Sequence, residues 1–178
     1  MRTLKKAFSS VLRFLLLPLS IIYRRHNGTP ERANRKELPN EHFLPLVSES
    51  LAKGLTATIW VRGYSMRPFI EHERDRVKLT AQDEYHIGDA VLAQIAPGHY
   101  VLHRIIALQG ERVTLQGDGN IRGVEHCTRG DICGVVVEYI RPGRTILASD
   151  PSLRRSIRLW RRLRPVRRVL LFAYRAVI

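Results

Sequence analysis

Tyr100-Val-Leu-His-Arg-Ile-Ile-Ala-Leu108 and Arg112-Val-Thr-Leu-Gln116 are two runs of apolar and β-branched residues, joined by Gln109-Gly-Glu111. A short glycine-containing segment between two such runs is typical of a β-hairpin. Four more runs of this kind lie in the same part of the chain, at residues 56–61, 76–80, 90–95 and 132–139. Because no helical pattern separates the runs, we expect a mainly β fold, with a coiled antiparallel sheet or a small, partly open barrel.

Positive charge is concentrated at the two ends of the chain. The 178 residues carry a formal net charge of +14, to which residues 1–40 contribute +7, residues 41–150 contribute −2 and residues 151–178 contribute +9. With 44% apolar residues, the chain can bury a core, so simple disorder is excluded. We therefore predict a nearly neutral β domain at 41–150, entered through a short helix at 41–53, between two helical basic arms.

The N-terminal arm contains Phe14-Leu-Leu-Leu-Pro-Leu-Ser-Ile-Ile-Tyr23, with basic residues before and after it. This run has about half of the roughly 20 residues that a helix needs to cross a bilayer. We expect the arm to lie on the membrane or dip into it, followed by a polar linker at 24–40. A cleaved secretory signal and a helix packed on the domain are the alternatives.

The C-terminal arm has apolar residues three or four positions apart, with most of its arginines between them. These apolar residues are Leu153, Ile157, Trp160, Leu163, Val166, Leu170, Ala173 and Val177. The pattern predicts an amphipathic helix, kinked or divided at Pro165, that lies on an anionic membrane surface. The alternative is that the stripe packs on the domain and leaves a solvated basic face.

Nucleic acid is not expected as a partner, because no zinc-finger spacing, RNP-like motif or helix-turn-helix pattern accompanies the basic residues. The two arms instead predict association with a membrane, for which the bacterial inner membrane is our interpretation. Positive charge on both sides of the N-terminal apolar run leaves the side of the membrane open.

Three segments carry candidate catalytic residues. Ser65 follows a predicted strand, between glycine and proline, where a tight turn can present both its hydroxyl and its backbone N–H to one cleft. The alternation along residues 100–106 turns His103 inward with Val101 and Ile105, where it is either a core residue or a general base. Asp118 lies in a turn after the strand that pairs with the His103 strand; it either orients His103 or belongs to an ordinary tight turn.

In their order and spacing, these segments resemble the signal peptidase and LexA-like superfamily of serine peptidases. The resemblance covers about residues 54–140. The matching boxes are Gly63-Tyr-Ser-Met-Arg-Pro68, Ile87-Gly-Asp-Ala-Val91, Leu102-His-Arg-Ile105 and Gly117-Asp-Gly-Asn120. The bacterial leader peptidases and LexA-type proteins use a lysine base. The His103-Arg104 pair is similar to the endoplasmic-reticulum and archaeal branch.

The resemblance implies a membrane-associated serine endopeptidase that cleaves leader or signal segments from precursor proteins, without a cofactor or metal. Ser65 would be the nucleophile, His103 the general base and later acid, and Asp118 a supporting carboxylate. The backbone N–H groups of Ser65 and Met66 would form the oxyanion hole. The family's acidic residues after the glycine-rich turn are missing here, and Glu125 is the next acid. Either Asp118 or Glu125 is therefore expected to complete the site.

Two other functions remain open at this level. A LexA-like self-cleaving regulator would need a cleavable linker, yet neither Ala-Gly nor Cys-Gly occurs before Ser65. A non-catalytic membrane-binding module would keep the motif segments only as turns. Cys127 and Cys133 are expected either to form a disulfide or to remain free thiols, and residues 71–75 are expected to form a solvated surface turn.

Overall fold

The computed structural model describes residues 40–177, which form an antiparallel sheet of eight strands and three α-helices. The expectations for the N-terminal arm lie outside the described residues. The strands are β1 (Ala57–Trp60), β2 (Arg76–Thr80), β3 (Ala90–Ala96), β4 (His99–Gln109), β5 (Arg112–Gln116), β6 (Glu125–Thr128), β7 (Ile132–Arg141) and β8 (Arg144–Leu147). The α-helices are α2 (Asn40–Ala52), α3 (Pro151–Arg162) and α4 (Arg167–Val177), and the 3₁₀ turns are η1 (Arg129–Asp131) and η2 (Arg164–Val166).

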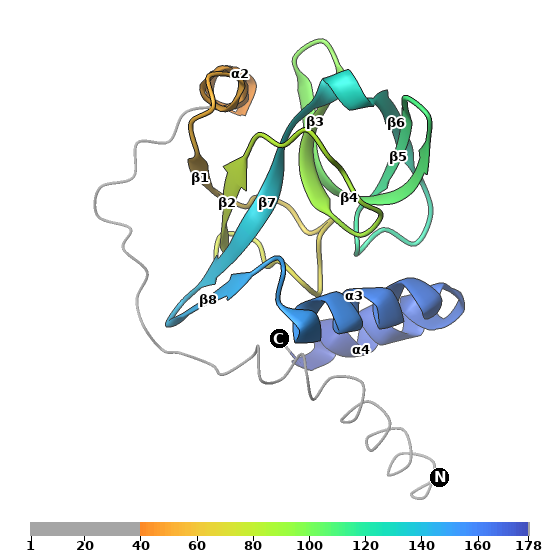
Figure 1. The fold of residues 1–178 in the computed structure, drawn as a ribbon. Helices are drawn as coiled ribbons and strands as arrows, with labels where there is room; N and C mark the ends of the chain where they lie inside the picture. The colour runs from red at the N-terminus through yellow and green to blue at the C-terminus, as the bar shows by residue number, and fades with distance from the viewer. Residues whose placement is uncertain (1–39, 178) are drawn as a thin grey trace, which may run out of the picture.

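The sheet is coiled but does not close. Its strands follow the order β1-β2-β7-β3-β4-β5-β6, and β8 pairs with β7 as a branch. Although β3 and β6 are not neighbours in this order, they contact each other, so the sheet curls over itself at that end. Figure 1 shows β3 to β6 curving around a common centre, with α2 at one end of the sheet and α3 and α4 at the other.

The main secondary-structure predictions are confirmed. Each of the six predicted runs contains a strand, and the helix expected at 41–53 is α2. The β4–β5 hairpin turns at the expected glycine, Gly110, whose φ of 58° suits this residue. Strands β6 and β8 are not among the predicted runs. Both have only four residues, of which one is buried, so neither shows an alternating pattern long enough to recognise.

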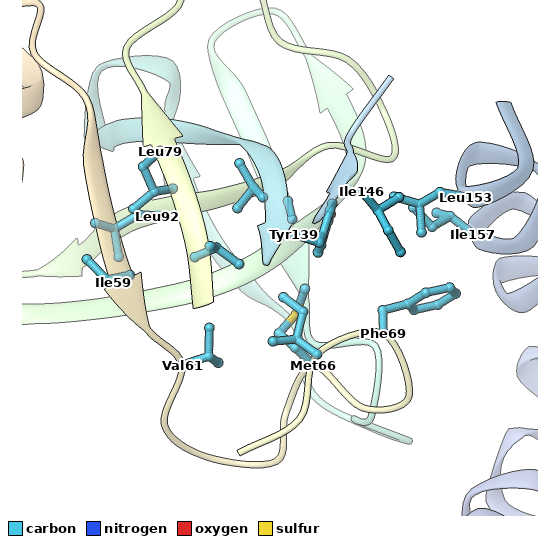
Figure 2. Packing of buried hydrophobic residues seen from close by; sticks show 14 of the residues in the cluster. Ile59, Val61, Met66, Phe69, Leu79, Leu92, Tyr139, Ile146, Leu153 and Ile157 are labelled. Carbon is cyan, nitrogen blue, oxygen red and sulfur yellow. The ribbon is translucent and has the colours of Figure 1, made fainter. Parts of the chain in front are cut away.

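Two hydrophobic cores lie on opposite sides of the coiled sheet. The smaller core fills the curl of β3 to β6 with residues such as Val91, Ile105 and Leu115. The larger core joins the sheet to α2, α3 and α4. Figure 2 shows Met66 and Phe69, from the loop between β1 and β2, in this larger core with side chains of the sheet and of α3.

The C-terminal helices belong to the larger core. Asp150 begins α3 by accepting hydrogen bonds from the backbone N–H groups of Ser152 and Leu153, and η2 separates α3 from α4, as expected from Pro165. Four residues of the predicted stripe are buried against the domain: Leu153, Ile157, Trp160 and Leu170. For these four, the structure supports packing on the domain, and the expectation that they face a membrane is wrong.

No helix within residues 40–177 combines the length and the apolar content needed to span a bilayer.

Trp160 tests whether α3 is part of the fold. Its side chain is 5% exposed, packs edge-on against Phe69 and donates a 2.9 Å hydrogen bond from Nε1 to the Asp118 carbonyl oxygen. We expect Trp160→Ala to lower the free energy of unfolding by about 3–5 kcal/mol, because it leaves a large cavity. Leu159→Ala, at a neighbouring side chain that is 40% exposed, should cost below about 1 kcal/mol. Urea unfolding measures both, and equal losses would contradict the packing of α3.

Candidate active site

The turn that carries Ser65 is anchored in the larger core. Gly63, with a φ of 94°, lets the chain leave the end of β1 in a conformation that other residues rarely adopt. The Met66 and Phe69 side chains that follow are buried. Ser65 itself is half-buried. Because Gly63, Met66 and Phe69 fix the turn around it, they also fix the position of the Ser65 backbone.

A second turn, at residues 117–120, presses against the Ser65 turn. The Gly119 N–H donates a 2.7 Å hydrogen bond to the Ser65 carbonyl oxygen. A Cβ atom at Gly117 would lie 2.5 Å from the same oxygen, and one at Gly119 would lie 2.8 Å from the Tyr64 carbonyl oxygen. The two glycines of the Gly-Asp-Gly-Asn box are therefore required by this close backbone approach.

His103 lies on the strand next to these turns and is buried, as predicted. Arg104 pairs with Gln116 across β4 and β5. Gly117 directly follows Gln116, so it comes close to the His103-Arg104 segment of β4. A Cβ atom at Gly117 would meet the Ser65 carbonyl oxygen, and Phe69 of the Ser65 turn contacts the Arg104 guanidinium, so this turn lies beside the His103-Arg104 segment of β4. Within residues 40–177, no hydrogen bond joins the Ser65 hydroxyl to the His103 ring.

Glu125, and not Asp118, is the carboxylate next to His103. Glu125 Oε2 lies 2.9 Å from His103 Nδ1. A carboxylate only accepts hydrogen bonds, so Nδ1 carries the proton and Nε2 is left as the basic nitrogen. Glu125 is the first residue of β6 and pairs with Leu115, which puts its side chain on the same face of the coiled sheet as His103.

The prediction that Asp118 supports His103 is wrong, because Asp118 binds Arg104 on the other face of β4. Arg104 donates from Nε to Asp118 Oδ1 at 2.8 Å and from Nη2 to Oδ2 at 2.6 Å. The Arg104 and Asp118 side chains are only 1% and 3% exposed. Burial alone would lower the pKa of Arg104, but the attraction of the Asp118 carboxylate and hydrogen bonding outweigh it, so the pKa is raised. Asp118 is thus a structural residue that fixes the 117–120 turn.

Glu71 and His72 also hold the Ser65 turn, which corrects the expectation of a solvated turn at 71–75. The Glu71 carboxylate is buried and accepts hydrogen bonds from Arg67 Nε at 2.9 Å and from the Tyr174 hydroxyl of α4 at 3.3 Å. His72 Nδ1 accepts a 3.0 Å hydrogen bond from the Gly63 N–H. A contact across 103 residues leaves no local signal, so the sequence could not reveal the link to α4.

The two cysteines and the possibility of a metal site remain to be described. Cys127 and Cys133 are free thiols, and burial raises the pKa of Cys127 to about 11. In the described part of the chain, no group of three or more His, Cys, Asp or Glu residues is arranged to hold a metal ion.

Neither the protein-family models nor the curated proteins include a match to this chain. The geometry of Ser65, His103 and Glu125 is therefore the basis for a functional proposal.

Asp118→Asn tests the structural role of the buried ion pair. This change leaves the Arg104 charge buried without its partner, so we expect the free energy of unfolding to fall by about 3–5 kcal/mol. The control is Glu138→Gln, which removes the partner of Lys78 in a pair whose side chains are 25% and 35% exposed. Such a pair contributes at most about 1 kcal/mol. If chemical unfolding gave the same small loss for both variants, Asp118 would not have the structural role described.

Gly117→Ala tests the close approach of the two turns. The new methyl group meets the Ser65 carbonyl oxygen and has to push the Ser65 turn away, which should cost about 1–3 kcal/mol. At Gly130, the nearest atom to an added Cβ is 3.8 Å away, so Gly130→Ala should stay within about 0.5 kcal/mol of the wild type. Thermal unfolding followed by circular dichroism compares the two. A neutral Gly117→Ala variant would contradict the contact.

Proposed function

We propose that this chain is a membrane-associated serine endopeptidase of the signal-peptidase type, with Ser65 as nucleophile and His103 as general base. The observation that supports it best is the 2.9 Å contact between His103 Nδ1 and Glu125, in the segment of β4 beside which the Ser65 turn lies. The coiled antiparallel sheet is compatible with the signal peptidase and LexA-like fold, which we propose as the finer classification.

In the proposed reaction, the Ser65 hydroxyl attacks the scissile carbonyl carbon and His103 Nε2 takes its proton. Glu125 positions the imidazole and stabilises the imidazolium that forms. His103 then gives the proton to the leaving amine, and the peptide bond breaks to leave an ester on Ser65. A water molecule attacks this ester, its proton passes through His103 to Ser65, and the new carboxyl terminus is released.

Two backbone groups are suited to bind the oxyanion that forms during attack. Within residues 40–177, the Ser65 and Met66 N–H groups donate to no backbone oxygen. They lie in the turn that Gly63, Met66 and Phe69 hold in place, so their directions are preorganised. The reaction also requires the Ser65 hydroxyl to come within about 3 Å of His103 Nε2, a hydrogen bond that substrate binding has to form.

The charge distribution and the resemblance support the proposed substrate class. A nearly neutral domain of −2 sits between basic segments of +7 and +9, which favour an anionic membrane surface. Precursor proteins with leader or signal segments are the peptide substrates that such an enzyme would meet at a membrane. We propose the bacterial inner membrane as its location.

Replacement of the three site residues tests the proposal. We expect Ser65→Ala to abolish peptide hydrolysis, because no nucleophile remains. His103→Ala and Glu125→Gln should lower the rate by roughly 10²–10⁴-fold, since the proton transfer is lost or misdirected. Hydrolysis of a peptide library, followed by mass spectrometry, gives the rates. Urea unfolding of each variant separates a loss of chemistry from a loss of structure.

The matched controls are residues of the same types outside the candidate site. His126 is exposed on β6, and Ser156 and Glu138 are half-buried on α3 and β7. Ser156→Ala, His126→Ala and Glu138→Gln should retain the wild-type rate.

If folded Ser65→Ala and His103→Ala proteins kept full activity, the mechanism would be wrong. A fluorophosphonate should label Ser65, and no labelling would favour a non-catalytic module. A shortened intact mass after incubation would favour self-cleavage.

A further inference from the structure

Helix α4 has two different faces, and only one of them is used by the fold. The inward face carries Arg167, Leu170, Leu171 and Tyr174, all buried. The outward face carries Arg168, Val169, Phe172 and Arg175, all exposed. Phe172 is 76% exposed and Val169 is 50% exposed, which is unusual for large apolar side chains so close together on a helix that already packs on a core.

A loop next to the Ser65 turn extends this outward face. Ile121, which is 49% exposed, follows the 117–120 turn directly. It lines one side of a shallow hollow of about 340 Å³, and residues of α4, including Phe172, line the other. We call Ile121, Arg168, Val169, Phe172 and Arg175 together the α4 surface.

The charge around the apolar side chains indicates what can cover them. Residues 151–178 contain nine arginines and no acidic residue. Apolar side chains that enter the region between headgroups and acyl chains, with basic side chains beside them, are the composition of helices that bind anionic lipid. A soluble acidic partner would form ion pairs with the arginines, but its binding would not require Phe172 and Val169 to be exposed together.

We propose that the α4 surface docks on an anionic lipid bilayer, with Phe172, Val169 and Ile121 inserted and Arg168 and Arg175 against the headgroups. Two other occupants are disfavoured by charge. A symmetric pair of chains would bring the same arginines face to face. The chain's own N-terminal segment carries +7 and would be repelled. The residues involved differ from the predicted membrane-facing stripe, of which Leu153, Ile157, Trp160 and Leu170 are buried.

Two connections join this surface to the candidate active site, one along the chain and one through hydrogen bonds. Ile121 is two residues from Gly119, whose N–H binds the Ser65 carbonyl oxygen. Tyr174, on the inward face of α4, binds Glu71, which in turn binds Arg67 beside Ser65. Docking through α4 would therefore hold the Ser65 turn near the bilayer surface. The lipid-binding proposal itself does not depend on peptidase activity.

Quenching of a new tryptophan by brominated lipids tests the insertion directly. The full chain with Phe172→Trp is mixed with vesicles of phosphatidylglycerol and phosphatidylcholine whose acyl chains are brominated. Leu55→Trp is the matched control: Leu55 is 57% exposed and precedes β1, at the opposite end of that strand from the Ser65 turn. The wild-type protein, with Trp60 and Trp160, gives the background. We expect strong quenching of the tryptophan at 172 and none beyond background at 55.

Partition between buffer and vesicles tests the role of charge and measures its size. Arg168→Gln and Arg175→Gln should each weaken binding to anionic vesicles about fivefold, the effect of one basic side chain at such a surface. Arg112→Gln is the control, because Arg112 is exposed at the end of β5 that lies away from the 117–120 turn. Phe172→Ser should also weaken binding, and vesicles of phosphatidylcholine alone should bind much less of the wild-type protein.

Several results would overturn the proposal. If vesicle-bound Phe172→Trp protein showed no more quenching than Leu55→Trp, another segment would carry the binding. Equal binding to neutral and anionic vesicles would remove the argument from charge. Sedimentation velocity without lipid checks the remaining occupant: a wild-type dimer that Phe172→Ser converts to a monomer would show that a second copy covers this surface. None of these measurements uses peptide hydrolysis, so they are independent of the proposed reaction.

Discussion

The structure around the candidate site depends on one buried ion pair, between Arg104 and Asp118. Arg104 also donates to the Gly88 carbonyl oxygen at 2.7 Å, and the Asp118 carbonyl oxygen accepts from Trp160. The pair thus connects β4, the segment before β3, the turn after β5 and helix α3. Removing two charges from water costs free energy, so such a pair adds little net stability. It does raise the free energy of competing arrangements of these segments, because these would leave one of the charges buried without its partner. Its contribution here is to select one position for the 117–120 turn, against which the Ser65 turn rests.

The neighbouring residues His103 and Arg104 point to opposite faces of β4 and have different roles. Successive side chains of a strand point to opposite sides, so His103 faces Glu125 within the curl of the sheet and Arg104 faces Asp118 and the C-terminal helices. A shift of β4 by one residue would exchange the two and leave a guanidinium in the smaller apolar core. The buried ion pair therefore also fixes the register that orients the proposed base.

The sequence predicts the strands because each contains a local run of apolar and β-branched residues, and it predicts the inward direction of His103 from the alternation along residues 100–106. It does not tell which carboxylate meets His103. Asp118 and Glu125 both follow β5, but their side chains point to different faces of the sheet. Because the backbone between β5 and β6 is irregular, the sequence does not show which face each side chain takes. Strand β6 positions Glu125, yet its four residues, with Cys127 alone buried, give no periodic signal. The apolar stripe of the C-terminal arm is visible in the sequence, but its contacts with Phe69 and the sheet depend on residues far away along the chain.

The hydrogen bond between Tyr174 and Glu71 has a consequence for the order in which the molecule is assembled during synthesis. The Ser65 turn is made early, but part of its support comes from a residue that follows it by more than one hundred positions. Protein synthesis adds about 5–20 residues per second, so this support arrives several seconds after Ser65 itself. A growing chain therefore lacks this hydrogen bond to the Ser65 turn until residue 174 has been added.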